Sequence, residues 1–173
     1  MEDEQGSLSD QIWRLNFVWW FDVSCTFQGL MPGNYIPLVH LKCTRSFADP
    51  SNAVQISLFL SKASSDSTIP LYTHSFNSYY DSSITDQWVW LQLPVVNVLD
   101  YIQNARLVMY EHGNSIVKSG LVLDCICMIP EAQVNSFLDL YSADPPAITS
   151  HDSSSASNGT GFLSGLWDLL TRN

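Results

Sequence analysis

Residues 16–27 read NFVWWFDVSCTF, and this stretch decides the fold class because its bulky residues alternate along the chain. A strand points successive side chains to opposite faces, so a period of two indicates a β-strand with one buried face. Trp20 falls on the face opposite Trp19, so we expect Trp19 in the core and Trp20 as an exposed platform. The predicted inner face carries Phe17, Trp19, Phe21, Val23, Cys25 and Phe27.

Six further strands are predicted, separated by clusters of Ser, Asp, Asn and Pro. Short strands with polar breaks indicate an all-β fold, an antiparallel β-sandwich with jelly-roll character. Pro37 has no N–H to donate, which suggests that its strand lies at an edge or carries a bulge. Residues 95–102 fit either a short helix or another strand. The six candidates run over 35–43, 54–60, 69–76, 87–93, 105–111 and 117–128.

The chain divides into an acidic tail (1–10), a sandwich domain (11–141), a flexible linker (142–161) and a short amphipathic helix (162–173). Val134, Phe137, Leu138 and Tyr141 recur at helical spacing and predict a short helical addition to the sandwich. The linker is too polar and Gly/Pro-rich to bury much apolar surface. The last segment gathers its apolar residues on one helical face: Phe162, Leu163, Leu166, Leu169 and Leu170, with Trp167 beside them.

The net charge of the 173 residues is −10, and residues 10–130 hold nine acids against six bases. The acidity is therefore concentrated at the two ends, and without a basic stripe we expect no nucleic-acid partner. The acidic start is opposite in sign to a signal peptide, and no apolar run is long enough to cross a bilayer. We expect a cytoplasmic or nuclear protein and no membrane partner.

Four cysteines without a secretion signal are expected to stay reduced and to pack as small hydrophobes. Cys125 and Cys127 share a strand face, but no CxxC pair or histidine cluster completes a ligand set, so we expect no metal and no cofactor. The sequence also contains no Gly-x-Ser-x-Gly elbow, and its four histidines are scattered. We therefore expect no enzyme; the catalytic alternative pairs Glu111 with Asp124 as glycosidase carboxylates.

Binding residues are predicted where the strand 105–111 ends, because Glu111, His112 and Asn114 offer hydrogen-bonding groups suited to a neutral polyol. Tyr79 and Tyr80, in a loop rich in rings and polar groups, are candidates for a second wall, or they anchor their own loop. Trp88 and Trp90 share a face, and we favour packing against the opposite sheet over an exposed aromatic surface.

Four short motifs resemble one known family, the phloem protein two lectins of plants, also called Nictaba-like lectins. They are Trp20-Phe21-Asp22-Val23, Leu30-Met31-Pro32-Gly33-Asn34-Tyr35, Tyr110-Glu111-His112 and Lys118-Ser119-Gly120-Leu121-Val122-Leu123. They occur in the family's order, and the resemblance covers roughly residues 13–130. The resemblance implies a nucleocytoplasmic β-sandwich lectin that binds N-acetylglucosamine oligomers or the cores of N-linked glycans.

Within this resemblance, Glu111 matches a loop glutamate that the family uses to hold sugar. Three positions depart from the pattern. A tryptophan pair that the family carries upstream is missing, with Trp13 the one candidate in its place. A second family carboxylate falls near Asn104, and the tryptophan before Lys-Ser-Gly is Val117.

Two hypotheses follow. The first is a lectin, in which dimerisation would raise the avidity of a weak, shallow site. The second is a sandwich that has lost its sugar site and serves as an interaction scaffold, docking a protein partner through the amphipathic segment. The residues that would make that contact are Phe162, Leu163, Leu166, Trp167 and Leu170.

Overall fold

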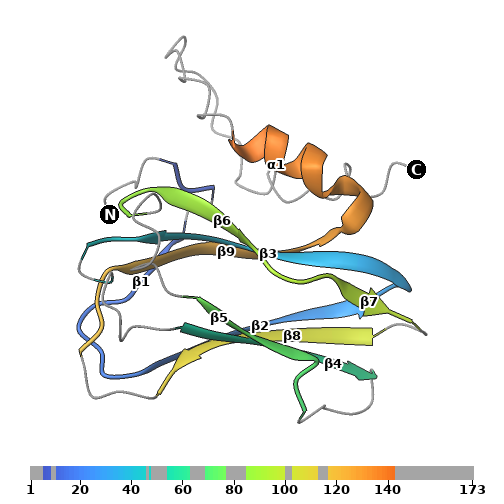
Figure 1. Cartoon of the computed structure of the whole chain (residues 1–173), viewed down its shortest axis with the longest axis horizontal. Coiled ribbons are helices and arrows are strands. Elements are labelled where there is room, and N and C mark those ends of the chain that lie inside the picture. The colour runs from blue at the N-terminus through green and yellow to red at the C-terminus, as the bar shows by residue number, and fades with distance from the viewer. Residues whose placement is uncertain are drawn as a thin grey trace, which may run out of the picture.

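The structure of this chain, a computed structural model, describes residues 6–8, 11–45, 47, 54–62, 69–76, 85–99, 103–112 and 117–142. Two antiparallel sheets pack face to face, and one short helix covers the outer face of one of them (Figure 1). The predicted antiparallel β-sandwich with a helical addition after Pro130 is thus confirmed. The linker 142–161 and the segment 162–173 lie outside the described residues, apart from the helix end.

The first sheet, here called the β3 sheet, has the order β1-β9-β3-β6, with β7 paired beside β6 along β3. The second, here called the β8 sheet, has the order β2-β8-β4-β5. The strands of the first are β1 Trp13–Arg14, β3 Gly33–Cys43, β6 Trp88–Gln92, β7 Val96–Val98 and β9 Leu121–Pro130; those of the second are β2 Phe21–Leu30, β4 Val54–Lys62, β5 Tyr72–Phe76 and β8 Gln103–Glu111.

Between the sheets lies the main core, built from the alternate residues that each strand turns inward. On β2 the inner face begins with the buried Phe21, while Asp22 and its alternate neighbours face outward. The central strand β8 alternates in the same way, with Ala105, Leu107 and Met109 fully buried. Residues 95–102, which fitted a helix or a strand, contain the short strand β7.

The strand predicted from residue 16 begins only at Phe21, and the expectation that Trp19 is a core residue is wrong. Phe17 adopts φ 49°, in the left-handed region, which turns the chain away from a strand. Residues 15–20 instead connect the two sheets, and the backbone of Val18 exchanges hydrogen bonds with Lys118. As a result Trp19 and Trp20 are both exposed, by 60% and 71%.

Pro37 lies in the central strand β3, so the expectation of an edge strand is wrong as well. Its missing N–H is tolerated because β3 changes partner there: β7 pairs with residues 33–35 and β6 with residues 38–42. The carbonyl of Pro37 still accepts a hydrogen bond from the Leu93 amide at 3.0 Å. The register shift of β3 occurs further on, between His40 and Leu41.

A second apolar layer lies on the outer face of the β3 sheet, under a 3₁₀ turn at Glu131–Gln133 and the helix α1 at Val134–Ser142 (Figure 1). Val134 and Phe137 are each 3% exposed and contact Ile36, Leu38 and Ile129. The indole of Trp90 meets the ring of Phe137 edge-on, with centroids 5.2 Å apart. The helix therefore belongs to the folded domain.

The expectation that Trp88 and Trp90 pack against the opposite sheet is wrong, because they lie on this outer face. The imidazole of His40 stacks between their indoles, with centroid distances of 4.9 and 4.5 Å. Residues 6–8 pass over this group so closely that a Cβ added to Gly6 would meet Trp88 Cδ1 at 2.7 Å. Residues 6–8 thus cover this part of the outer face.

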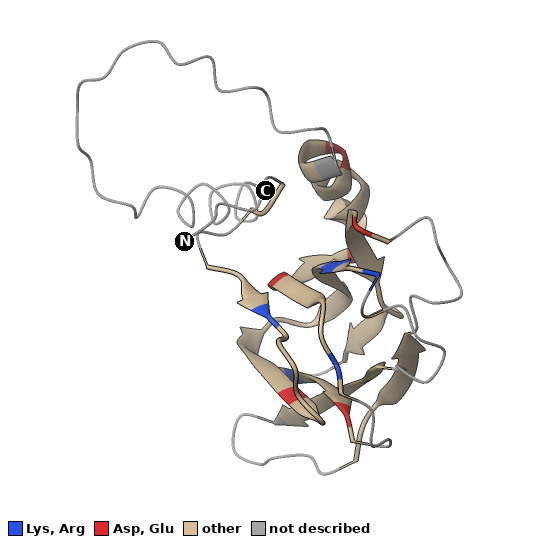
Figure 2. Ribbon diagram, turned by 90° about the vertical axis from the view of Figure 1, so that its left-hand side faces the viewer, with Lys and Arg blue, Asp and Glu red and all other residues tan. Residues whose placement is uncertain are grey.

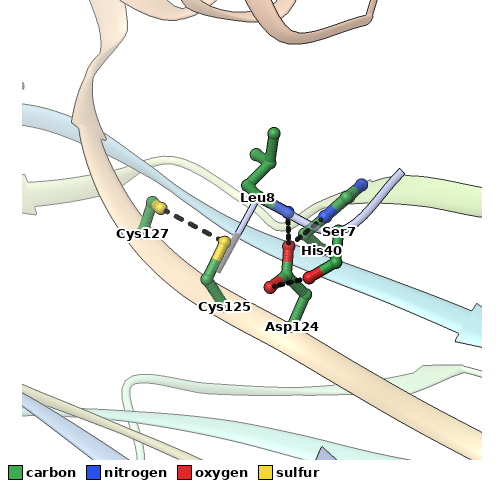
Figure 3. Close-up of polar contacts among 6 residues, drawn as sticks. All are labelled: Ser7, Leu8, His40, Asp124, Cys125 and Cys127. Atoms are coloured by element: carbon green, nitrogen blue, oxygen red, sulfur yellow. Dashed lines mark hydrogen bonds and ion pairs between the residues drawn. The ribbon is translucent and has the colours of Figure 1, made fainter. Parts of the chain in front are cut away.

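Beneath residues 6–8, the side chain of Asp124 is fully buried and its carboxylate accepts several hydrogen bonds (Figure 3). His40 Nδ1 lies 2.8 Å from one carboxylate oxygen, which also accepts the Leu8 amide at 2.8 Å. Ser7 Oγ donates to the other oxygen at 2.9 Å. Burial alone would raise the pKa of Asp124, but these hydrogen bonds outweigh burial and hold the pKa below its usual value.

Replacing Phe137 by alanine tests whether α1 is part of the fold. We expect Phe137→Ala to lower the free energy of unfolding by about 3–5 kcal/mol, because it opens a cavity under the helix. Leu140→Ala is the control in the same helix, since Leu140 is 56% exposed, and it should cost about 0.5 kcal/mol or less. Urea unfolding of both variants measures the difference, and equal effects would show that α1 is not docked.

Candidate functional site

The outer face of the β8 sheet carries a shallow hollow of about 510 Å³, across all four of its strands. The period of two that buries one face of each strand turns the remaining side chains to this surface. Its lining mixes hydroxyl, charged and aromatic groups: Asp22 and Ser24 from β2, Ser57 and Phe59 from β4, Thr73 from β5, Arg106, Val108 and Tyr110 from β8, with Pro70 and His112 at its ends.

A second hollow of about 600 Å³ adjoins the first and shares Asp22 and His112 with it. Trp20 and Phe21 complete its lining. The aromatic rings follow one another along this end of the sheet: the ring centroids of Trp20 and His112 lie 6.4 Å apart, and those of His112 and Tyr110 5.4 Å apart. We call the two hollows together the β8 groove.

Hydrogen-bonding groups are spread along the β8 groove. Asp22 contributes a carboxylate that accepts, and Arg106 a guanidinium that donates, so the two charges of the lining balance. The Arg106 guanidinium stacks over Phe59 at 4.8 Å, and Ser57 shares a 2.9 Å hydrogen bond with Thr73. Charged residues elsewhere in the described part are few and scattered (Figure 2). The groove suits a neutral ligand rich in hydroxyl groups.

Glu111 does not face this groove, although His112 beside it does. Because β8 alternates, Tyr110 and His112 turn outward while Glu111 turns toward the sandwich interior, where it is 5% exposed. There its carboxylate forms an ion pair with Lys118 Nζ, and Lys118 is fully buried. The expected exposed carboxylate at Glu111 is therefore corrected to a buried, paired one.

Lys118 also donates from Nζ to the carbonyl of Trp19, at 2.5 Å. The residue next to that carbonyl is Trp20, and the residues flanking Glu111 are Tyr110 and His112. The buried pair therefore ties together the two chain segments that present the aromatic rings of the groove.

The other predicted site residues are distributed as follows. Trp20 and His112 are brought together in the β8 groove. Trp13 is 69% exposed but pairs with Leu123 in the β3 sheet and does not line either hollow. Asn114, Tyr79 and Tyr80 lie outside the described residues, as do the proposed contact residues Phe162, Leu163, Leu166, Trp167 and Leu170, so the scaffold hypothesis stays a prediction.

The pairing of Glu111 with Asp124 as glycosidase carboxylates is wrong for this arrangement. Glu111 points into the sandwich from the β8 sheet, and Asp124 lies under residues 6–8 on the outer face of the β3 sheet. Two catalytic carboxylates must flank one scissile bond. These two groups do not open onto a common surface.

Sequence reasoning missed Ser24, Ser57, Thr73 and Arg106 as groove residues. The alternation of β2 was visible in the sequence and marked Ser24 as outward. The neighbours of Ser24 across the sheet depend on register, for example Ser24 opposite Val108 and Ser57 opposite both Val108 and Thr73. Pairing between strands so distant along the chain was not readable from composition or period.

No protein-family model matches the chain, and no curated protein matches its sequence. Among solved structures, the chain is similar to a carbohydrate-binding module described as "CBM4 structure and function". The TM-score is 0.37, with 12% identity over 73% of this chain and 79% of that chain. This similarity extends no further than the general architecture.

Breaking the buried ion pair should destabilise the domain strongly. We expect Glu111→Gln or Lys118→Met to lower the free energy of unfolding by about 3–5 kcal/mol, because each leaves a buried charge without its partner. The double variant should lose less than the two single losses combined, since it leaves neither charge. Urea unfolding measures all three against Asp22→Asn, an exposed control. A loss below about 1 kcal/mol for both single variants would contradict the buried pairing.

Proposed function

We propose that this protein is a non-catalytic carbohydrate-binding protein whose site is the β8 groove. The observation that carries the proposal is the run of outward rings from Trp20 through His112 to Tyr110, set along two adjoining hollows lined with hydrogen-bonding groups. The Trp20 indole is 71% exposed and is grouped with the rings of His112 and Tyr110, and a contiguous exposed patch of this kind is typical of a binding surface.

The groove provides the two kinds of contact that a sugar needs. A pyranose ring has an apolar face, which stacks on an aromatic side chain such as Trp20 or Tyr110. Its hydroxyl groups both donate and accept hydrogen bonds. Asp22 can accept from them, Arg106 can donate to them, and the hydroxyls of Ser24 and Thr73 can do either. Bonds to the ionised Asp22 are strengthened by its charge.

The size of the groove favours an oligosaccharide over a monosaccharide. Each hollow alone, at about 510 and 600 Å³, falls in the usual range for a small-ligand site. Because the two share Asp22 and His112, one extended ligand can occupy both. An open, shallow site excludes little water, so we expect weak affinity for each site and a gain in avidity from dimerisation.

N-acetylglucosamine oligomers or N-glycan cores are the ligands we propose, on the basis of the motif resemblance to the phloem protein two lectins. The acetamido group suits the groove, since its methyl group packs on an indole and its N–H donates to a carboxylate such as Asp22. A cytoplasmic or nuclear location is part of the same proposal. Among the described residues, none of the helices has the length and apolar character that a membrane-spanning helix requires.

An NMR titration of the full chain with chitotriose, the N-acetylglucosamine trimer, tests the proposal. We expect saturable shifts of the Trp20 indole and of amides in β2 and β8, and about tenfold weaker binding in Trp20→Ala and Tyr110→Ala, a change of about 1.4 kcal/mol. Trp13→Ala is the matched control, because Trp13 is equally exposed but lies on the other sheet.

The outcomes separate the ligand class from the particular sugar. Binding of cellotriose but not chitotriose at the β8 groove would keep the carbohydrate function and overturn the N-acetylglucosamine assignment. An equal loss in Trp13→Ala would move the site away from the groove. Unchanged spectra with millimolar amounts of both sugars would overturn the proposed function.

A further inference from the structure

A second group of chemically active side chains lies on the outer face of the β3 sheet, apart from the β8 groove (Figure 3). One imidazole nitrogen of His40, one carboxylate oxygen of Asp124 and the sulfur of Cys125 all lie within 4.8 Å of one another. The sulfur of Cys127 lies 4.0 Å from that of Cys125. One nitrogen, one oxygen and one sulfur therefore converge from the neighbouring strands β3 and β9, and a second sulfur lies beside the first.

A β-bulge in β9 creates this convergence. His40 is opposite Cys125 in the register, but the next residue, Leu41, is opposite Leu123, so Asp124 is the extra residue of the bulge. A bulge redirects side chains locally and here brings two consecutive residues, Asp124 and Cys125, to the same histidine. Cys127 follows two residues later on the same face as Cys125.

These four donors form the type of set that binds Zn²⁺. Zinc takes four ligands in a tetrahedron, with nitrogen and oxygen at about 2.0–2.2 Å and sulfur at about 2.3 Å, which places the ligand atoms about 3.3–3.8 Å apart. His40 and Asp124 are 2.8 Å apart and the two sulfurs 4.0 Å apart, just below and just above this range. The ligand atoms of His40, Asp124 and Cys125 lie within 4.8 Å of one another, and rotation of the Cys127 side chain toward them would complete the tetrahedron.

The surroundings hold the donors in place. His40 and Asp124 are only 4% and 6% exposed. The two indoles that sandwich His40 fix the plane of its ring, and Ser7 Oγ and the Leu8 amide donate to the carboxylate of Asp124. Ligands oriented by such outer hydrogen bonds and a water-excluding shell are typical of metal sites.

A buried His–Asp pair alone explains two of these residues but not the two thiols beside it. Sequence spacing led us to expect no metal, because Cys125 and Cys127 are too few by themselves to form a ligand set. The fold raises the number of candidate donors, since it adds His40 from β3 and Asp124 from the bulge to the two cysteines. Soft thiolates with an imidazole select zinc over magnesium or calcium.

We propose that His40, Asp124, Cys125 and Cys127 form a closed structural site for one Zn²⁺. With four protein donors and no open coordination position, the site stabilises the fold and does no chemistry on a substrate. Because Ser7 and Leu8 bond to a ligand carboxylate, the ion also fixes the N-terminal segment over the β3 sheet.

Cobalt substitution tests the site in the full-length reduced chain. Co²⁺ binds such sites more weakly than Zn²⁺ and reports thiolate ligation by a near-ultraviolet charge-transfer band. We expect one Co²⁺ per chain with that band, displaced by Zn²⁺. The band should be lost in Cys125→Ser and Cys127→Ser and kept in Cys25→Ser, a control on β2 of the other sheet. No stoichiometric band in the parent chain, or a full band in Cys125→Ser, overturns the proposal.

Alkylation of the unmutated protein gives an answer that does not depend on whether the variants fold. Peptide mapping after iodoacetamide treatment, with and without Zn²⁺, should show protection of Cys125 and Cys127 by the metal, and unchanged labelling of Cys25. Equal labelling of Cys125 and Cys127 in both conditions, at a zinc concentration that saturates any site, overturns the zinc site.

Discussion

The buried contact between Glu111 and Lys118 is the constraint on which the arrangement of the β8 groove depends. An ion pair inside a sandwich must be closely matched, because either charge alone would be very costly there. Lys118 meets this requirement by pairing with Glu111 and donating to the Trp19 carbonyl at once. The end of β8 and the connecting segment 15–20 are held together as a result, and with them the rings of Trp20, His112 and Tyr110. Glu111, which the sequence marked as a sugar-binding residue, is thus proposed to position the rings that contact the sugar.

The two sheets differ in what covers their outer faces, and this difference separates two possible roles. The β8 sheet presents its outer face as a groove of mixed aromatic and polar character. The β3 sheet carries a second apolar layer, with α1 over one part and residues 6–8 over another. The outer face of the β8 sheet is therefore suited to ligand binding. The covered outer face of the β3 sheet, where His40 and Asp124 are buried with two thiols beside them, is suited to stabilising the fold.

Local pattern was a good guide wherever the chain continued in one direction. The alternation of residues 21–27 predicted both the strand and its inward set, the run 105–111 predicted a strand, and helical spacing after Pro130 predicted α1. The same reasoning failed where the chain turned or changed partner. Phe17 has a positive φ, so the strand begins only at Phe21 and does not include Trp19. Pro37 is tolerated inside a central strand because the neighbour of β3 changes there from β7 to β6. Trp88 and Trp90 were placed on the wrong side because helix cover on a sheet is not visible from the strand itself.

The sequence by itself determined the fold class, most of the strands, the helix after Pro130 and two groove residues, Trp20 and His112. These follow from period and composition, which act over a few neighbouring residues. Only the tertiary structure decided that Glu111 faces inward to Lys118, that Arg106, Ser57 and Thr73 line one hollow with Asp22, and that His40 meets Asp124 and Cys125. The contacts within each sheet depend on register between separate strands, and a shift of one residue would turn every side chain of a strand to the other face.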